Sequence, residues 1–317
     1  MILIDFSNRK SVTRVEKNNE IAWYIDKGFG DPFELIPATD KKLIINVALT
    51  GNVPTREMTP HVPLTPQEII NDSQRCYQAG ASIIHIHARD EKGKPTYEAS
   101  VFEEIISGVK KKCEDVIICV TTSGRIFNTF YCRSQVLNLI ENSKPDMASL
   151  TMGSMNFPNQ AGVNSPQIIQ KLANLMLERG IKPEMEIFET GMINYAKYLK
   201  RKGFFNGTLY FNLFLGLLGT MPARLIDLDH LLLTLPVDSE WAGAGVGRFQ
   251  LPINIASIIK GGHVRVGLED NIYFDRNKKM YATNEQLVNR IVHFSKKIGR
   301  DIATPSEARK MLGLDLI

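Results

Sequence analysis

After Lys42 the sequence alternates apolar segments of strand length with segments of helix length, and this alternation limits the folds open to the chain. Repeated βα units of this kind predict a parallel sheet, because each crossover helix returns the chain to the same edge. Eight strands are predicted, at residues 43–49, 82–87, 116–121, 147–151, 184–188, 209–216, 241–246 and 264–267. The predicted helices are at 66–79, 99–112, 132–142, 165–179, 191–203, 224–233, 250–260 and 284–299.

Eight βα units that close on themselves form an α/β TIM (β/α)8 barrel, and a chain of this length is often one such domain. The main rival is an open, doubly wound sheet. No Gly-x-Gly-x-x-Gly follows the first strand, which weakens a dinucleotide-binding interpretation. We therefore predict a barrel over residues 42–317, preceded by an N-terminal extension over residues 1–41.

The composition narrows the class of protein. A hydrophobic fraction of 44% and a charged fraction of 23% are ordinary for a globular domain. The net charge of +4 is weak, and no dense basic block argues for nucleic acid. No apolar stretch approaches a membrane span. The four cysteines have no Cys-x-x-Cys spacing, which favours reduced thiols. We expect a cytoplasmic protein that acts on a small molecule.

The second predicted strand ends in a pair of histidines, His85 and His87, inside an apolar run. Side chains at positions i and i+2 point to the same face of a strand, so the two imidazoles lie side by side. Two neighbouring imidazoles on a rigid element suit zinc or a similar divalent ion. The alternative is a pair of pocket histidines without a metal. The pair lies where the strand runs into a loop, the edge at which barrels bind ligands.

The fifth predicted strand carries two carboxylates, Glu184 and Glu186, on one face. Buried charges are unfavourable unless they are paired, hydrogen-bonded or bound to a metal. For Glu184, a structural salt bridge to Arg265 or Arg89 and a catalytic role are equally open. Glu186 lies nearer the carboxyl end of the strand, which favours function. Hydroxyl groups of Thr121 and Ser123 end the third strand, and Ser149 lies on the fourth.

The eighth predicted strand supplies a further carboxylate. Arg265, Gly267 and Glu269 share one face if the strand stays extended to its end. Glu269 would then complete a His-His-Glu site with one open position, the arrangement of a catalytic zinc. Asp270 and Arg265 could serve as a base and its orienting cation. The alternative is that residues 269–271 form only a polar turn. His263, at the start of the strand, is expected to be structural, as are His61, His230 and His293.

Seven ordered motifs together resemble the β-keto acid cleavage enzymes, a family whose best-known member cleaves 3-keto-5-aminohexanoate in lysine fermentation. The resemblance runs from about Lys42 to the end of the chain. The motifs are Leu49–Gly51, Pro63–Pro66, Ala79–Asp90, Ser149–Phe157, Pro183–Phe188, Gly243–Arg248 and Gly261–Asn271.

The resemblance implies a zinc-dependent barrel, usually a homotetramer, that converts a β-keto acid and acetyl-CoA into acetoacetate and a new acyl-CoA. Motif by motif, it implies three sets of residues. The zinc ligands are His85, His87 and Glu269; the catalytic residues are the base Asp270 with its partners Arg265 and Glu186; the substrate-binding residues are Thr121, Ser123, Gly124 and Ser149.

One position departs from the family pattern. The amine-cleaving member places an acidic residue shortly after the first strand's Thr-Gly, where this chain has Val53. A valine cannot pair with an ammonium group, so the substrate is expected to lack the 5-amino group unless another residue, with Glu57 the first candidate, supplies the charge.

Two other enzyme classes remain open, a metal-dependent hydrolase and an aldol-type lyase on the same barrel. A hydrolase of the amidohydrolase type places its His-x-His pair on the first strand, whereas here the pair follows a complete βα unit. A non-enzymatic binding barrel is the least favoured alternative, because paired carboxylates and an arginine at strand ends are costly for binding alone. Dependence on acetyl-CoA separates the first interpretation from the other enzymes.

Overall fold

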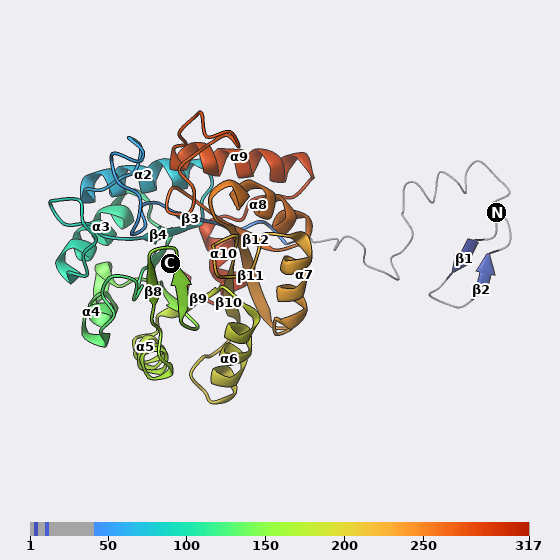
Figure 1. Cartoon of the computed structure of the whole chain (residues 1–317), viewed down its shortest axis with the longest axis horizontal. Helices are drawn as coiled ribbons and strands as arrows, with labels where there is room; N and C mark the ends of the chain where they lie inside the picture. The colour runs from blue at the N-terminus through green and yellow to red at the C-terminus, as the bar shows by residue number, and fades with distance from the viewer. Residues whose placement is uncertain (1–2, 6–9, 13–40, 317) are drawn as a thin grey trace. The chain divides into compact units, whose positions relative to one another are not determined.

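The computed structural model describes residues 3–5, 10–12 and 41–316. Eight parallel strands close into a barrel in the order β10-β11-β12-β3-β4-β5-β6-β9, with helices in a ring around them (Figure 1). This confirms the predicted TIM barrel and excludes the open sheet. The strands are β3 (Ile45–Ala48), β4 (Ile83–Ile86), β5 (Ile117–Val120), β6 (Met147–Thr151), β9 (Lys182–Ile187), β10 (Leu209–Leu215), β11 (Ser239–Gly245) and β12 (His263–Val266).

The helices form where the sequence places caps. Before α2, Thr65 and Glu68 form a capping box, Pro66 takes the first helical position, and Gly80 ends the helix in a left-handed conformation. The helices are α2 (Pro66–Ala79), α3 (Ala99–Lys112), α4 (Phe130–Ser134), α5 (Pro166–Arg179), α6 (Thr190–Arg201), α7 (Leu225–Thr234), α8 (Gln250–Ile259), α9 (Asn284–Lys297) and α10 (Pro305–Leu312).

Along the strands, alternate side chains point into the barrel, and those inner residues change character from one end to the other. On β4 the inward series runs from Ile83 through His85 to His87. On β6, Met147 is packed with Ile83, and Ser149 and Thr151 follow it on the same face. The amino ends of the strands therefore hold an apolar plug, and polar groups gather at the carboxyl ends.

Helix α10 closes the apolar end of the barrel. Its buried Ala308 and Leu312 form one core cluster with Ile44, just before β3, Ile83 on β4 and Tyr210 on β10. Figure 1 shows α10 inside the ring formed by the other helices. This helix was not predicted from the sequence, although Thr304, Pro305 and Glu307 supply a capping box and a proline at its start. Because α10 fills this end, the cavity that the described residues form lies at the carboxyl ends of the strands.

The predicted helix at 132–142 is wrong in extent. The chain instead forms α4, then two short 3-10 turns, η1 (Gln135–Asn138) and η2 (Glu141–Ser143). The side chains of Gln135 and Asn138 donate to backbone carbonyl groups of the preceding turn, which competes with the helical pattern. A hairpin of β7 (Met155–Phe157) and β8 (Gln160–Gly162) after β6 was also not predicted.

The predicted extension over residues 1–41 lies largely outside the described residues. Within it, β1 (Leu3–Asp5) and β2 (Lys10–Val12) pair as an antiparallel two-stranded sheet. The division of the chain at residues 41 and 42 stays a prediction.

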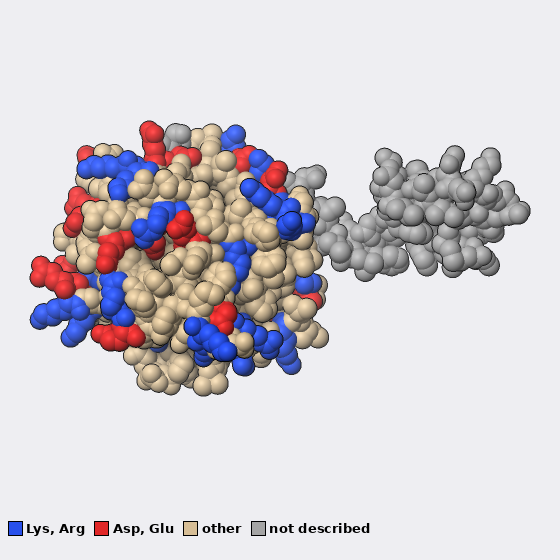
Figure 2. All heavy atoms as spheres, turned by 90° about the horizontal axis from the view of Figure 1, so that it is seen from above, with Lys and Arg blue, Asp and Glu red and all other residues tan. Residues whose placement is uncertain are grey.

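The expectations from composition concern surface charge, membrane spans and cysteines. Basic and acidic side chains lie intermixed on the face in Figure 2. Among the described residues, no helix is long and apolar enough to cross a membrane. The four cysteines, Cys76, Cys113, Cys119 and Cys132, are all free.

Candidate active site

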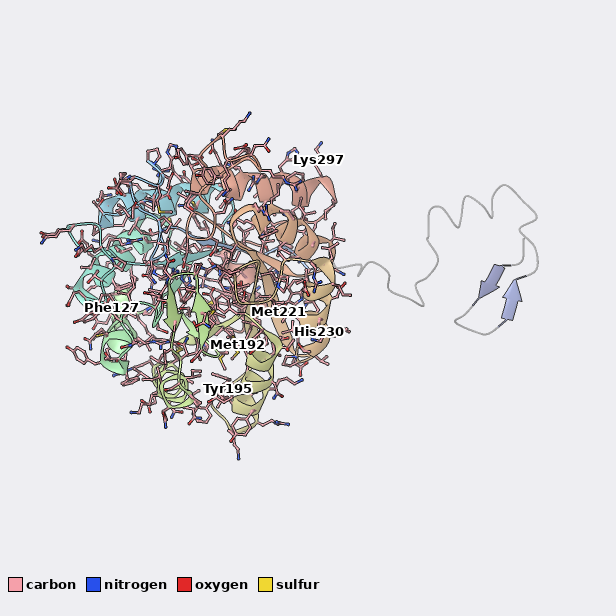
Figure 3. All side chains as sticks on the ribbon, in the orientation of Figure 1. Phe127, Met192, Tyr195, Met221, His230 and Lys297 are labelled. Atoms are coloured by element: carbon pink, nitrogen blue, oxygen red, sulfur yellow. The ribbon has the colours of Figure 1, made fainter. Side chains whose placement is uncertain are left out.

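The predicted histidine pair lies at the carboxyl end of β4 and points into the barrel. Both side chains are almost fully buried, with His85 at 0% and His87 at 3% exposure. Their ring centroids lie 5.3 Å apart. Of the remaining histidines, His230 lies exposed on α7 at the outside of the barrel (Figure 3), and His263 accepts a hydrogen bond from the backbone of Ile44. Among the described residues, His85 and His87 are the only histidines in a group of side chains that could hold a metal ion.

Glu269 reaches the histidines by a route that the sequence did not predict. Strand β12 ends at Val266, and Gly267 follows with φ +142°. The position requires glycine, since a Cβ atom there would lie 2.1 Å from the carbonyl oxygen of Ala48. The backbone N–H groups of Asp270 and Asn271 then donate to the carbonyl group of Gly267. This turn, rather than an extended strand, aims Glu269 at the histidines. Gly51 makes room for it, since a Cβ there would lie 2.5 Å from the Glu269 side chain.

The geometry of these three side chains suits a metal ion. Nε2 of His87 lies 3.1 Å from Oε1 of Glu269, and Nε2 of His85 lies 3.8 Å from Oε2. Two ligands of a tetrahedral zinc ion with bonds of about 2.0–2.1 Å lie roughly 3.3 Å apart, a comparable spacing. Nε2 of His85 is buried and has no hydrogen-bond partner among the described residues. A metal ion would satisfy that atom.

Glu184 lies beneath the triplet and holds His85 in place. Its Oε2 is 2.9 Å from Nδ1 of His85, and its other oxygen accepts a hydrogen bond from Asn46. A carboxylate on Nδ1 fixes the tautomer that leaves Nε2 free as a ligand. Although burial acts in the opposite direction, His85 and Arg265 lower the pKa of Glu184 to about 2. Glu184 is thus a buried structural anion, and Arg265, not Arg89, is its arginine partner, at 3.7 Å.

A second cluster of candidate ligands, His85, Cys119 and Glu184, shares His85 with the first. The Cys119 thiol donates to Glu184, and burial raises its pKa well above the usual range. A metal-binding thiolate is therefore disfavoured there. His87 and Glu269 line the large cavity described below, which favours the His85–His87–Glu269 set.

Arg265 joins the triplet to Asp270. Its Nε donates to Oδ2 of Asp270 at 2.9 Å, and its Nη2 lies 3.1 Å from Oε2 of Glu269. The ring of Phe214 lies under the guanidinium, at 4.9 Å. The surrounding carboxylates outweigh burial and raise the pKa of Arg265 well above its ordinary value. Arg265 is therefore a permanent cation that fixes the orientation of both acids.

The pKa shifts of His87, Asp270 and Glu186 suit one metal ligand and two bases, whereas the pKa of His85 is raised, because Glu184 and Glu269 outweigh burial and Arg265. Burial lowers the pKa of His87, and Glu269 opposes this only in part, so the imidazole stays neutral, as a ligand must. Burial raises the pKa of Asp270 although Arg265 acts against it. Burial likewise raises the pKa of Glu186, which accepts a 2.6 Å hydrogen bond from Thr151. Both carboxylates are stronger bases than exposed ones.

A cavity of about 1140 Å³ opens over these groups. Three of the predicted substrate-binding residues, Thr121, Ser123 and Gly124, line it, as do Arg265, Glu186 and Asp270. Ser149 is placed differently. It is 1% exposed, and its hydroxyl accepts from the backbone N–H of Thr122, so it fastens the loop after β5 to β6. The substrate contact predicted for Ser149 remains untested.

Two residues that were not predicted from the sequence, Asn52 and Arg133, support the site from neighbouring segments. Oδ1 of Asn52 lies 3.3 Å from Nδ1 of His87. The one sequence signal for this residue is its place directly after Thr50-Gly51. Arg133 on α4 is buried and donates to the carbonyl group of Thr122, where it braces the loop that carries Thr121 and Ser123. No sequence motif marks either contact, because each depends on how a loop folds back over the end of a strand, 35 residues away for Asn52 and His87 and 11 for Arg133 and Thr122.

The chain matches known proteins over almost the whole barrel. Residues 42–314 match the family model described as beta-keto acid cleavage enzyme. A 3-keto-5-aminohexanoate cleavage enzyme of Fusobacterium nucleatum is 41% identical, over 86% of this chain and 98% of the relative. A 3-oxoadipate:acetyl-CoA acetyltransferase of Cupriavidus necator is 36% identical, over 86% of this chain and 94% of the relative.

Solved structures resemble the fold at lower identity. The protein ObcA, in a binary complex with oxaloacetate, superposes with a TM-score of 0.72 at 20% identity. The match covers 81% of this chain and 68% of ObcA. At that identity the likeness supports the barrel fold and nothing about the reaction.

Proposed function

The chain belongs to the β-keto acid cleavage enzyme family, and on that basis we propose that it converts a β-keto acid and acetyl-CoA into acetoacetate and a new acyl-CoA. The names of its relatives support an enzyme of acyl transfer and cleavage. The observation that carries the proposal is the His85–His87–Glu269 triplet, which opens on the cavity beside the Asp270–Arg265 pair.

We assign zinc to the triplet. The two imidazoles and one carboxylate are ligands that zinc accepts, and three protein ligands leave an open position toward the cavity. Bound there, the ion would supply Lewis acidity for the carbonyl oxygen of the keto acid.

Asp270 is the proposed base. Its raised pKa and its place on the cavity wall allow it to take a proton from the α-carbon of the keto acid. Arg265 holds the carboxylate in one orientation through its Nε and stabilises negative charge that develops nearby. Glu186 also lines the cavity, and Thr151 donates a hydrogen bond to its carboxylate. We propose that Glu186 assists the proton transfers of the reaction as a partner of Asp270.

The carbon chemistry then balances without another reactant. The α-carbanion attacks the thioester carbonyl of acetyl-CoA and expels the CoA thiolate. That thiolate attacks the original keto carbon, and the bond between this carbon and the α-carbon breaks. The products are an acyl-CoA from the keto side chain and acetoacetate, which recovers one proton.

The test is a panel of β-keto acids with acetyl-CoA, in which mass spectrometry follows the new acyl-CoA. The proposal requires acyl-CoA and acetoacetate in equal amounts, and no turnover without acetyl-CoA. Cleavage of a keto acid without acetyl-CoA would instead identify a lyase or a hydrolase, the alternatives on this barrel.

We further propose that the keto acid carries a neutral side chain. Val53 lines the cavity beside Asn52 and Met58, and 42% of its surface is exposed. Glu57 is not among the described residues that line the cavity, so it is a poor substitute for an acid at position 53. The relatives' names include an amino, a dicarboxylic and a dioxo acid, which agrees with a side chain that varies within the family.

Two further expectations follow from the family rather than from the site. We propose a homotetramer, which light scattering coupled to size-exclusion chromatography would test. We also propose a cytoplasmic location, which fractionation of the source cells would test.

A further inference from the structure

Three exposed cations lie on one side of the cavity mouth, and the reaction at the metal triplet does not use them. Arg248 follows β11, and Arg276 and Lys278 lie in the loop after β12. All three line the large cavity. Their side chains are therefore within reach of a ligand that enters it.

The two loops that carry these residues are held together. Strands β11 and β12 are neighbours in the barrel, and the backbone N–H of Gly247 donates to the carbonyl oxygen of Asp270 at 2.7 Å. Lys278 takes the left-handed conformation, with φ 58°, and its ammonium group lies 5.7 Å from the centre of the Tyr273 ring. The conformation is strained for a lysine, and such strain persists where the surrounding structure fixes it.

The positive charges are not neutralised by neighbouring acids. Within the described part of the chain, none of Arg248, Arg276 and Lys278 forms an ion pair. The nearest acid along the loop, Asp275, caps the turn: its two oxygens accept hydrogen bonds from the backbone N–H groups of Asn277, Lys279 and Met280. The carboxylate is thus committed to the backbone, and the charges remain available to an anion.

The cavity is also larger than a short keto acid needs. Its volume of about 1140 Å³ exceeds the roughly 300–1,000 Å³ of ordinary small-molecule pockets. Phe249, Leu251 and Leu217 line it with apolar surface, and Phe214 does so beside Arg265. These features suit an elongated ligand. Its anionic group would lie near the three cations at the cavity mouth, and its less polar arm would lie along the apolar side chains.

We propose that Arg248, Arg276 and Lys278 bind the phosphate groups of acetyl-CoA, so that the pantetheine arm passes the apolar wall to reach the metal triplet. This assignment rests on the proposed function. A phosphate monoester carries about −1.5 to −2 charges at neutral pH, and CoA carries a pyrophosphate in addition. Arginine and lysine are the side chains that recognise such groups.

The opposite side of the cavity is less suitable. Arg125, a cation on that side, stacks over the ring of Phe157 on β7 at 4.1 Å, as Arg248 does over Phe249 at 4.9 Å, but burial lowers the pKa of Arg125. Arg125 is a single, half-buried charge, whereas the β11–β12 side presents three exposed ones. This difference is why the phosphates are assigned to the β11–β12 side, and it supplies a comparison variant.

The experiment compares acetyl-CoA with acetyl-pantetheine, which has the thioester and the arm but no nucleotide phosphates. We expect Arg248→Ala combined with Lys278→Ala to lower the ratio of kcat/KM for acetyl-CoA to kcat/KM for acetyl-pantetheine by about tenfold, since two exposed charge contacts are lost. Adenosine 3′,5′-bisphosphate should inhibit the wild type in competition with acetyl-CoA, and should inhibit the double variant about tenfold more weakly.

The matched control is Lys111→Ala combined with Arg201→Ala, two exposed cations at the far ends of α3 and α6. This control should keep the wild-type ratio. The assignment is overturned if Arg248→Ala combined with Lys278→Ala keeps the ratio of the two kcat/KM values within twofold of the wild type. It is also overturned if Arg125→Ala lowers that ratio instead. A wild type that turns over neither thioester would refute the proposed function itself, which is a separate result.

Discussion

At the scale of single residues, His85 joins the two halves of the site. Its Nδ1 faces Glu184 and its Nε2 faces Glu269, so one imidazole connects a buried anion to the open cluster. The pair His85 and His87 was visible in the sequence, but the partner of each ring nitrogen was not. Three predictions belong to this scale.

The first prediction concerns the metal. His85→Ala should remove bound metal and turnover together, because two ligands hold a divalent ion far more weakly than three. Elemental analysis of the purified protein, together with the acyl-CoA assay, measures both. His230→Ala, at an exposed histidine on α7, is the control and should leave both unchanged. A His85→Ala protein that is folded, active and metal-free would refute the metal site.

The second prediction concerns Asp270. Asp270→Asn keeps the size and the hydrogen bond to Arg265 but removes the base, so kcat should fall by about 10²-fold or more. The metal content should stay at the wild-type level, which separates this variant from His85→Ala. Near-normal turnover would mean that another group, with Glu186 the first to test, takes the proton.

The third prediction concerns Val53. A buried ammonium group without a partner is unfavourable by several kcal/mol, so the wild type should prefer a β-keto acid with a neutral side chain over 3-keto-5-aminohexanoate. Val53→Glu should shift kcat/KM toward the amino substrate, and the isosteric Val53→Thr should not. A wild-type preference of tenfold or more for the amino substrate, about 1.4 kcal/mol, would show that Val53 does not set the choice.

At the scale of elements, strand β9 carries charged residues along one face of the barrel interior, from its amino end toward its carboxyl end. Glu184 and Glu186 face the site, whereas Lys182 lies at the start of the strand and donates to the carbonyl group of Thr208. Burial lowers the pKa of Lys182 to about 8, with a smaller effect from Lys200. The amino end of β9 therefore makes stability depend on pH.

The fourth prediction is the direction of that dependence. Between pH 8 and 10.5 the unfolded chain holds a proton on Lys182 that the folded chain has lost, so this group makes the protein more stable as the pH rises through that window. Lys182→Met should be more stable than the wild type at pH 7, by up to about 3 kcal/mol, and the difference should shrink toward pH 10.5. Urea unfolding at several pH values measures it, with the exposed Lys111→Met as control. A pH-independent difference would contradict the assignment.

At the scale of the whole molecule, the barrel has one closed end and one open end. The inner residues at the amino ends of the strands and the helix α10 fill one end with apolar side chains. The polar groups and the cavity lie at the other. The apolar plug and the polar site therefore lie at opposite ends of the barrel, while the main core packs the helices against the strands around it.

The fifth prediction tests the closed end. Leu312 on α10 is fully buried against the strands, so Leu312→Ala should lower the free energy of unfolding by about 2–5 kcal/mol. Leu316→Ala, at a leucine with 58% exposure, is the matched control and should change it little. Denaturant unfolding measures both variants. If Leu312→Ala were as stable as its control, α10 would not be part of the folded core.

The sequence alone determined the features that depend on local pattern. Alternating segments predicted the eight βα units and the barrel, because a strand and a helix have different periods of hydrophobicity. The spacing of His85 and His87 placed both on one face, since side chains alternate along a strand.

Only the tertiary structure decided which groups meet. The turn after Gly267 brings Glu269 to the histidines, Arg265 pairs with Asp270 and Glu184, and Ser149 is covered by the loop at Thr122. The cations at the cavity mouth, Arg248, Arg276 and Lys278, likewise come together only because β11 and β12 are neighbours in the closed barrel. Most of these contacts join residues that are distant along the chain, and even Arg265 and Asp270, five residues apart, meet only because the chain turns at Gly267. No local period in the sequence encodes these distances.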